Sequence, residues 1–361
     1  MNAVVMAVMA FFMTVGALDK ALFDGRYGYG AEFEKGLGAM GSLTIVMAGI
    51  MCAAPALGPV LAPVVSPFFL MIGSDPAMAA GLFLGVDSGG YPLARELAQQ
   101  PEAVILSGVG LGSTLGAVIT FALPLSLAMA NHRSRPYVAK GLVAAIVASP
   151  VSLLPVGLMT GCGVRTILCL GAPAFVTAFG LAACLLLFRE GTIRVFLRFA
   201  KGLMGIFVLL LAAAALQHYG FIPMIPGMAP IEPQLSLIGE IGLTLAGAFP
   251  LVFFVKKHGV RCVHALARCC RVDDSAALGM VVALANPLPM YAMTNTMSNR
   301  GKVLCAAFSG PALTLLGDHL GYVSAVCPEA MTPMLAGKLL AACTALVLAS
   351  ALEKWSPSPE D

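Results

Sequence analysis

The stretch from residue 75 to residue 97 reads DPAMAAGLFLGVDSGGYPLAREL, and it contains the interruption that decides the fold. Both of its arms are mainly apolar, but Asp87-Ser88-Gly89-Gly90 in the middle cannot continue a regular helix. A second stretch, SAALGMVVALANPLPMYAMTNTM at 275–297, is interrupted in the same way by Asn286-Pro287-Leu288-Pro289. We therefore expect two broken helices in the chain.

The composition indicates whether the chain lies in water or in a membrane. Hydrophobic residues make up 59% of the 361 residues and charged residues only 11%, under half the share usual in soluble domains. A water-soluble enzyme of this size would lack the charges to cover its surface, so we expect an integral membrane protein. Long unbroken apolar runs exclude a transmembrane β-barrel. A net charge of +3, with basic residues confined to short loops, gives no reason to expect a nucleic-acid partner.

The apolar runs predict an all-α polytopic membrane protein that forms a single domain over residues 1–361. About nine full transmembrane helices are expected at ~20 residues each, or ten to eleven if the broken stretches also cross. The nine runs are 3–18, 37–54, 103–129, 137–159, 166–188, 193–216, 235–255, 301–325 and 331–352.

Basic residues indicate the orientation, because short loops rich in Lys and Arg stay in the cytoplasm. Such loops lie within 131–140, 189–201 and 256–271, whereas 217–234 has neither Lys nor Arg. This places the amino terminus outside and the carboxyl-terminal tail, 354–361, inside. A full crossing at 275–297 would put Arg300 and Lys302 outside. Both broken stretches are therefore predicted to be re-entrant hairpins, with arms of about 16 Å that reach the bilayer midplane.

The two halves of the chain have the same order of elements in opposite orientations. We predict a first repeat at 3–159, a connecting helix at 166–188 and an inverted second repeat at 192–353. A shift of 198 residues supports the repeat, since it pairs Asp75 with Asp273 and Gly81 with Gly279. Inverted repeats are typical of secondary transporters, whose substrate site lies where broken helices meet.

Each half also has a surface segment before its broken stretch. Four prolines at 55, 59, 63 and 67 predict a chain of short turns in the first half. In the second half, residues 260–271 form an amphipathic pattern with basic residues on one face. This pattern predicts a helix that lies among the inner lipid headgroups.

Asp87 is the leading candidate for a substrate contact. A charge at bilayer depth costs at least about 2.5–3.5 kcal/mol on insertion scales, so it needs a partner or a function. With Ser88, Gly89 and Tyr91, Asp87 would offer a carboxylate, free backbone carbonyls and an aromatic ring to a small organic ammonium ion. Alternatively, Asp87 caps a half-helix or pairs with Arg95.

Four further residues complete the candidate set. Asn286 lies in the second break, where its amide could bind a neutral hydroxyl or instead satisfy backbone groups freed by the prolines. Asn295 lies one helical face away. Asp318 and His319 place a carboxylate and an imidazole inside the predicted span 301–325, where they could form a proton relay, contact a ligand or pair structurally.

The sequence points to transport rather than catalysis. It has no phosphate-binding loop, nucleophile elbow or zinc-protease motif, and its ten cysteines are scattered. We expect no catalytic residue, metal or cofactor. Transport would occur by movement of one repeat against the other. Two alternatives are an intramembrane enzyme that acts on lipid headgroups through Asp318 and His319, and a receptor, for which the short tail offers no output domain.

Several motifs together resemble the EutH-type ethanolamine permeases of bacterial ethanolamine-utilisation operons. The chain departs from the family pattern at Pro287, where a second Asn is usual. The motifs follow the family's order along the chain: Phe33-Glu34-Lys35-Gly36, Asp87-Ser88-Gly89-Gly90, Ile225-Pro226-Gly227-Met228, Leu284-Ala285-Asn286, Arg300-Gly301-Lys302-Val303, Leu316-Gly317-Asp318-His319-Leu320-Gly321 and Gly337-Lys338-Leu339.

The resemblance implies a facilitator in the bacterial cytoplasmic membrane that imports ethanolamine for a cytoplasmic ammonia-lyase. The candidate residues agree with this, since ethanolamine joins an ammonium, which a midplane acid would bind, to a hydroxyl, which an amide would bind. The expected partners are ethanolamine in its ammonium form, membrane lipids, and further copies of the chain in a homo-oligomer.

Overall fold

The structure is a computed structural model that describes residues 2–221 and 224–355, and within these ranges every regular element is helical. The predicted all-α class is therefore confirmed. Eight helical stretches in these ranges are long and apolar enough to cross a membrane, which makes the chain a multi-pass membrane protein. Residues 356–361 of the predicted tail lie outside the described residues.

The eight stretches differ in regularity. Three are built from shorter pieces, among them the π-helical η2 and η3, whose wider turns are common at functional sites. The single helices are α1 (Asn2–Phe23), α2 (Tyr29–Met71), α9 (Val164–Leu187), α10 (Arg189–His218) and α11 (Glu232–His258). The composite stretches are α5 (Pro101–Val104) with η2 (Ile105–Gly116), η3 (Val118–Ala122) and α6 (Leu123–Met129); α7 (Arg135–Ala148) with η4 (Ser149–Ser152) and α8 (Leu153–Met159); and η6 (Pro328–Ala330) with α17 (Met331–Trp355).

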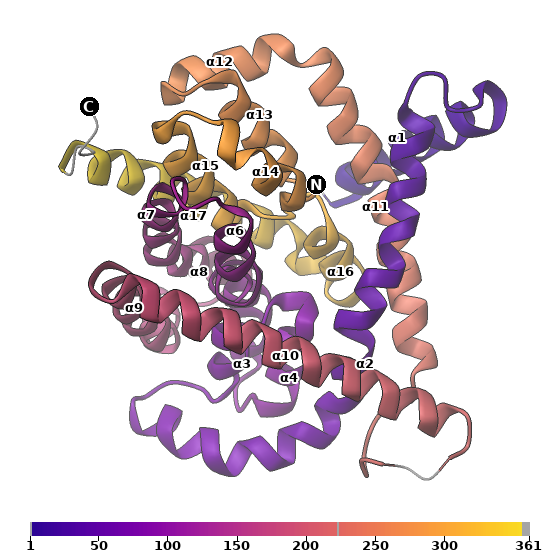
Figure 1. Cartoon of the computed structure of the whole chain (residues 1–361). Coiled ribbons are helices and arrows are strands. Elements are labelled where there is room, and N and C mark those ends of the chain that lie inside the picture. The colour runs from indigo at the N-terminus through magenta and orange to yellow at the C-terminus, as the bar shows by residue number, and fades with distance from the viewer. Residues whose placement is uncertain (1, 222–223, 356–361) are drawn as a thin grey trace.

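The helix α2 continues much further than the sequence predicts. It includes Pro55, Pro59, Pro63 and Pro67, so the expectation of a chain of short turns is wrong. Each proline removes one backbone hydrogen bond, but its fixed φ is close to the helical value. Prolines four residues apart lie along one side of a helix, which therefore bends instead of ending. In Figure 1, α2 descends at the right and its second part runs across the bottom of the molecule.

The first broken stretch folds back so that its ends meet. It consists of α3 (Ala77–Phe83), η1 (Val86–Gly90) and α4 (Tyr91–Leu97). Asp75, just before α3, accepts hydrogen bonds from the backbone N–H groups of Gln99 at 3.0 Å and Gln100 at 2.9 Å. The same carboxylate accepts the N–H of Ala77 at 2.9 Å. One buried side chain thus caps α3 and closes the stretch.

The second broken stretch closes in the same way. It consists of α13 (Asp274–Ala283), α14 (Pro287–Met293) and η5 (Thr294–Thr296). Asp273 accepts the N–H of Ser298 at 3.0 Å and that of Ala276 at 3.2 Å. Burial opposes the charge, but these bonds outweigh it and hold the pKa of Asp273 below its ordinary value. This stretch lies in the upper part of Figure 1, whereas α3 and α4 lie in the lower part.

The predicted span 301–325 is not one helix, so the expectation of nine full spans is wrong at this point. α15 (Asn299–Ala312) ends directly after Pro311, and α16 (Asp318–Val326) begins six residues later. Between them, Leu313 is extended, with φ −54° and ψ 137°, and Thr314 is left-handed, with φ 49°. The chain therefore contains a third break, and it places Asp318 at a helix terminus.

Backbone hydrogen bonds hold this third break against the second one. The N–H of Thr314 donates to the carbonyl of Ala283 at 3.0 Å, and that of Leu316 donates to Leu284 at 2.7 Å. These groups have lost their helical partners, so pairing them with each other avoids the cost of leaving them buried and unbonded. The end of α13 and the start of α16 are thereby fixed next to each other.

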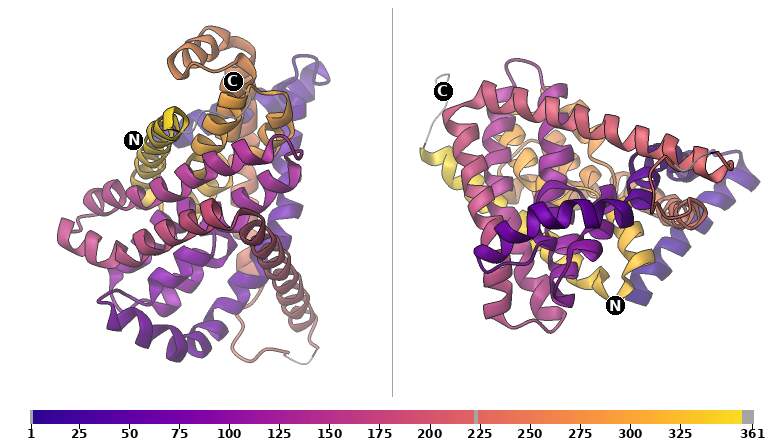
Figure 2. Two further views of the ribbon diagram at one scale, coloured as in Figure 1. Left: turned by 60° about the vertical axis from the view of Figure 1, so that its left-hand side comes forward. Right: turned by 90° about the horizontal axis from the view of Figure 1, so that it is seen from below.

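The helices form two packed groups. α1, α2 and α11 pack against one another at the right of Figure 1, and we call them the column. α7, α15 and α17 pack together; the second folded-back stretch packs against α15, and the first packs against η2, which itself contacts α15 and α17. We call these elements, together with the third break and α16, the body. α10 packs against the column through α2. Figure 2 shows α10 running along one side of the molecule.

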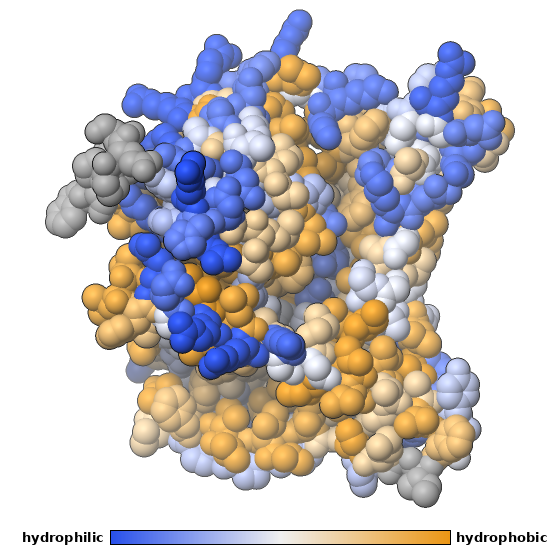
Figure 3. Space-filling view, in the orientation of Figure 1, coloured by the Kyte–Doolittle hydropathy of each residue, from blue (hydrophilic) through white to orange (hydrophobic). Residues whose placement is uncertain are grey.

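Hydrophilic and hydrophobic residues occupy different parts of the surface. Hydrophilic side chains gather at the top of Figure 3, over α12 (Val260–Cys270) and the turn between α1 and α2, and continue down the left side to about mid-height, whereas the lower half is mostly hydrophobic. Large apolar side chains such as Val64, Met71 and Leu187 are more than 70% exposed. So extensive an apolar surface is stable in contact with lipid.

Candidate functional site

The candidate site begins at η1, where the first stretch is broken. The break forms because Ser88, with φ −85° and ψ 39°, and Gly89, with φ 92°, leave the helical conformation, and a positive φ favours glycine. This break exposes Asp87 to the second half of the chain. Its Oδ1 accepts a hydrogen bond from Ser88 Oγ at 3.3 Å and lies 3.7 Å from Nε2 of His319.

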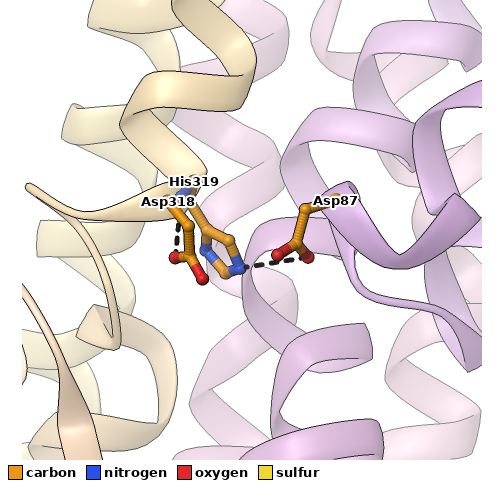
Figure 4. Close-up of side chains that lie close together, drawn as sticks. All are labelled: Asp87, Asp318 and His319. Atoms are coloured by element: carbon orange, nitrogen blue, oxygen red, sulfur yellow. Dashed lines mark hydrogen bonds and ion pairs between the residues drawn. The ribbon is translucent and has the colours of Figure 1, made fainter. Parts of the chain in front are cut away.

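Asp318 and His319 approach from the opposite side, at the amino terminus of α16. Asp318 accepts the backbone N–H of His319 at 2.9 Å, and the positive end of the helix dipole favours a carboxylate there. Figure 4 shows the His319 ring between the two carboxylates. One ligand atom from each of the three residues lies within 4.8 Å of the others. The breaks thus bring together residues that are more than two hundred positions apart in the sequence.

A lysine completes this cluster. Lys338 of α17 is fully buried. Its Nζ donates to the carbonyl of Ser113 at 2.5 Å and lies 2.9 Å from Nδ1 of His319. In the sequence, Lys338 was predicted only as part of the family motif Gly337-Lys338-Leu339. The missed signal was a lone lysine in the apolar run 331–352, because a cation at bilayer depth needs a partner as much as an anion does.

A cavity of about 240 Å³ lies between the body and the helices α2, α10 and α11. The two walls differ in polarity, because most of the polar lining side chains come from the body, with Ser42 of α2 and Thr120 of η3 as the exceptions. Its polar side is formed by Asp87, Ser88, Asn286, Thr314, Asp318 and His319. The facing side is mainly apolar and is formed by Leu43, Val46, Leu203, Phe207, Leu245 and Phe249.

Asn286 reaches this cavity and also has a structural role. Its Oδ1 accepts the N–H of Leu288 at 2.9 Å and caps α14. The backbone role foreseen for this side chain is therefore present. The amide nitrogen remains as a donor toward the cavity that the residue lines.

Three other predicted contacts lie outside the lining of this cavity. Gly89 shapes the break, and Tyr91 packs edge-on against Tyr322 with ring centroids 6.2 Å apart. Asn295 accepts the N–H of Asn131 at 2.9 Å and donates to the carbonyl of Met129 at 3.3 Å. It thus ties the end of the second broken stretch to the turn between α6 and α7.

The partner of Asp87 also differs from the one considered in the sequence. Among the described residues, His319 lies within ion-pair distance of this carboxylate, whereas Arg95 is exposed. The buried carboxylate is therefore paired across the molecule and not along its own helix.

The third break is strained where it lines the cavity. Thr314 is buried with φ 49°, and a β-branched residue in this conformation costs on the order of 1–3 kcal/mol. Close packing leaves little freedom nearby, since a Cβ on Gly317 would lie 2.2 Å from the carbonyl oxygen of Ala285. Backbone strain of this kind clusters at functional sites.

The charges of the cluster favour a monovalent ligand. By spacing alone, Asp87, Asp318 and His319 could hold a metal ion. However, the Lys338 ammonium lies against the imidazole, and its positive charge opposes a divalent cation. With both carboxylates ionised and the imidazole neutral, the cluster carries one net negative charge, which a single organic ammonium would balance.

Broken helices that surround a charged cavity inside a multi-pass bundle are typical of secondary transporters. The family model described as "Ethanolamine utilisation protein, EutH" matches residues 1–352, and the chain belongs to this family. The resemblance seen in the motifs is confirmed. Family membership also agrees with the prediction that the chain is a transporter and not an enzyme.

Bacterial relatives match over nearly the whole chain. A "Probable ethanolamine permease EutH" of Listeria monocytogenes serotype 1/2a (strain 10403S) is 37% identical, with 96% of this chain and 93% of the relative covered. The protein of the same name in Escherichia coli (strain K12) is 35% identical, with coverage of 97% and 95%. "Uncharacterized protein YxeR" of Bacillus subtilis (strain 168) is 35% identical, with coverage of 97% and 94%. No solved structure matches the chain.

Proposed function

We propose that the protein is an ethanolamine permease of the bacterial cytoplasmic membrane and that Asp87 binds the ammonium group of its substrate. The observation that carries this proposal is the incomplete bonding of a buried carboxylate on a cavity wall. A carboxylate has about four acceptor positions. Among the described residues, Asp87 receives one long side-chain hydrogen bond, from Ser88, interacts with the backbone N–H groups of residues 87 and 88, and faces His319 at 3.7 Å. Positions therefore remain for an ammonium.

The hydroxyl of ethanolamine would bind at Asn286. The Oδ1 of this amide caps α14, which leaves its N–H groups to donate to the hydroxyl oxygen. Ethanolamine has only four non-hydrogen atoms, so a cavity of about 240 Å³ has room for it together with water. An ammonium, a hydroxyl and two carbons thus match a carboxylate, an amide and an apolar facing wall.

The charge balance also suits transport of a cation. The unoccupied cluster carries one net negative charge when both carboxylates are ionised, and a bound ethanolammonium cancels it. A neutral site is easier to move through a medium of low dielectric constant than a charged one. Substrate binding would therefore favour the movement that carries the substrate across.

The movement we propose displaces the body against the column. The substrate groups on one wall of the cavity all belong to the body, so they can move together. The two folded-back stretches lie in opposite halves of the molecule in Figure 1, and Asp75 and Asp273 have the same role in closing them. These features support an inverted repeat of 3–159 and 192–353, connected by 166–188, with one re-entrant hairpin from each side of the membrane.

The substitution Asp87→Asn tests the binding role. It removes the charge but keeps the size, and loss of one partner from a buried charge pair costs about 3–5 kcal/mol. Saturable uptake of labelled ethanolamine into proteoliposomes should therefore fall at least about a hundredfold. The matched control is Glu102→Gln, an exposed acid outside the cavity, which should transport normally. Transport by Asp87→Asn at the wild-type rate would exclude the proposed site.

A further inference from the structure

Lys338 determines the protonation state of the His319 imidazole, which lies beside the proposed ammonium site. Its Nζ lies 2.9 Å from Nδ1 of His319, and the carbonyl of Ser113 accepts a second hydrogen bond from it. A charged lysine has donors only, so Nδ1 must accept. The ring proton is then on Nε2, the atom that faces Asp87 at 3.7 Å.

A doubly protonated His319 is incompatible with this arrangement. Both ring nitrogens of an imidazolium donate, so Nδ1–H would point at an ammonium 2.9 Å away. The two positive charges would also repel each other where His319 is only 2% and Lys338 0% exposed. As long as Lys338 is charged, His319 stays neutral.

We propose that Lys338 is a positioning residue that keeps ethanolamine binding insensitive to acid by preventing His319 from becoming a cation that competes for Asp87. The inference rests on the proposed ammonium site at Asp87. Without the lysine, an imidazolium at 3.7 Å would pair with the carboxylate and displace the substrate. The protection would matter in acid, where almost no neutral ethanolamine remains to diffuse through lipid.

The groups around His319 on each neighbouring element agree with this role. η1 presents Asp87, α17 presents Lys338, and α16 itself contributes Asp318. From α11, the apolar side chains of Leu245 and Phe249 line the same cavity as His319. Among the described residues, Lys338 is thus the cation in contact with the imidazole, and its removal leaves two carboxylates that favour protonation of the ring.

The test is the Michaelis constant for ethanolamine uptake into proteoliposomes, compared between about pH 7.5 and about pH 5.5, on either side of an ordinary imidazole pKa of about 6.5. The substrate amine stays protonated over this range. The wild-type constant should change less than about twofold. In Lys338→Met it should rise about tenfold, because at one pH unit below its pKa an imidazole is only about a tenth neutral.

Two controls separate this effect from general damage. Lys302→Met removes another largely buried lysine, one that donates to Asn299. The ratio of its Michaelis constants at about pH 5.5 and about pH 7.5 should equal that of the wild type. The double variant His319→Gln/Lys338→Met has no imidazole to protonate, so its ratio should return to that of the wild type. A pH-independent constant in Lys338→Met, or an acid-sensitive one in the wild type, would overturn the inference.

A second measurement does not depend on folding of the lysine variant. In wild-type protein with ¹⁵N-labelled histidine, the His319 resonances, assigned by comparison with His319→Gln, should report a neutral ring protonated on Nε2 at about pH 5.5. A doubly protonated ring would refute the role of Lys338. Failure of the proposed function is a separate result, since it would show as normal uptake by Asp87→Asn.

Discussion

At the scale of single residues, the site depends on side chains in unusual local states. Asp87 is a carboxylate with unfilled acceptor positions, Lys338 is a cation with no exposed surface, and Thr314 is a β-branched residue with a left-handed backbone. Each of these states would be unfavourable alone. They persist because the three breaks bring them together.

The backbone strain at Thr314 can be measured by comparing the stability of an alanine and a glycine variant. Glycine is usually the less stable of the two, but at Thr314 it should be the more stable. Both Thr314→Ala and Thr314→Gly remove the side chain, but only glycine adopts φ 49° without strain. The glycine variant should therefore be the more stable by about 1 kcal/mol. At Thr344, inside α17, alanine should instead be the more stable by about 1 kcal/mol. Thermal unfolding in detergent compares the four variants, and the same order at both positions would show that Thr314 is unstrained.

The sequence predicted some of these residues and missed others. Asp87, Asp318 and Asn286 could be predicted because an acid or an amide in an apolar run, or beside a glycine or proline interruption, is visible without a structure. Lys338 could not be linked to His319 in this way. Their contact depends on the position of α16, which is set by a break that the sequence reasoning did not foresee.

At the scale of elements, breaks and bends decide where the functional groups lie. The interruptions at 87–90 and 286–289 were predictable, since glycine pairs and closely spaced prolines end helices. The break at 313–317 was not, because Pro311 precedes it and its backbone pairs with Ala283 and Leu284 far away in the sequence. The prolines of α2 caused the opposite error. They predicted a chain of short turns, but the helix continues, because prolines spaced along one side allow it to bend.

The closure of the first folded-back stretch provides a test at this scale. In Asp75→Asn, one acceptor oxygen remains for the cap on α3, while the amide that replaces the other oxygen can no longer accept from Gln99 and Gln100. Bonds to charged groups contribute about 1.5–3 kcal/mol each. Hydrogen exchange should therefore accelerate at Gln99 and Gln100 at least about tenfold and much less at the start of α3. Glu102→Gln, an exposed neighbour, is the control, and uniform exchange across 75–100 would contradict the separate roles of the two oxygens.

At the scale of the whole molecule, charge and apolarity are divided between surfaces. Basic residues of α12 and the hydrophilic top of Figure 3 lie at the end where the second folded-back stretch closes. The positive-inside rule assigns this end to the cytoplasm. The orientation, the inverted repeat and the homo-oligomer remain predictions from the sequence, and the first of them can be tested directly.

Cysteine labelling tests the orientation. Cys262 and Cys269 are exposed on α12, at the end predicted to be cytoplasmic. A membrane-impermeant thiol reagent should therefore label them in inverted vesicles and not in intact cells. Tyr219→Cys, in the loop predicted to face outward, should show the opposite pattern in a background without these two cysteines. Labelling of α12 from outside would reverse the proposed orientation.

The unequal walls of the cavity have a consequence for how this family can diversify. The groups proposed to bind the head of the substrate belong to one set of helices, and the surface opposite them is mainly hydrocarbon from α2, α10 and α11. Replacing Phe207 or Phe249 by smaller residues would enlarge the space beyond the substrate carbons without touching a polar contact. Descendants of such a protein could therefore acquire bulkier amino alcohols as cargo through substitutions on the column and α10 alone, while the chemistry of recognition is inherited unchanged.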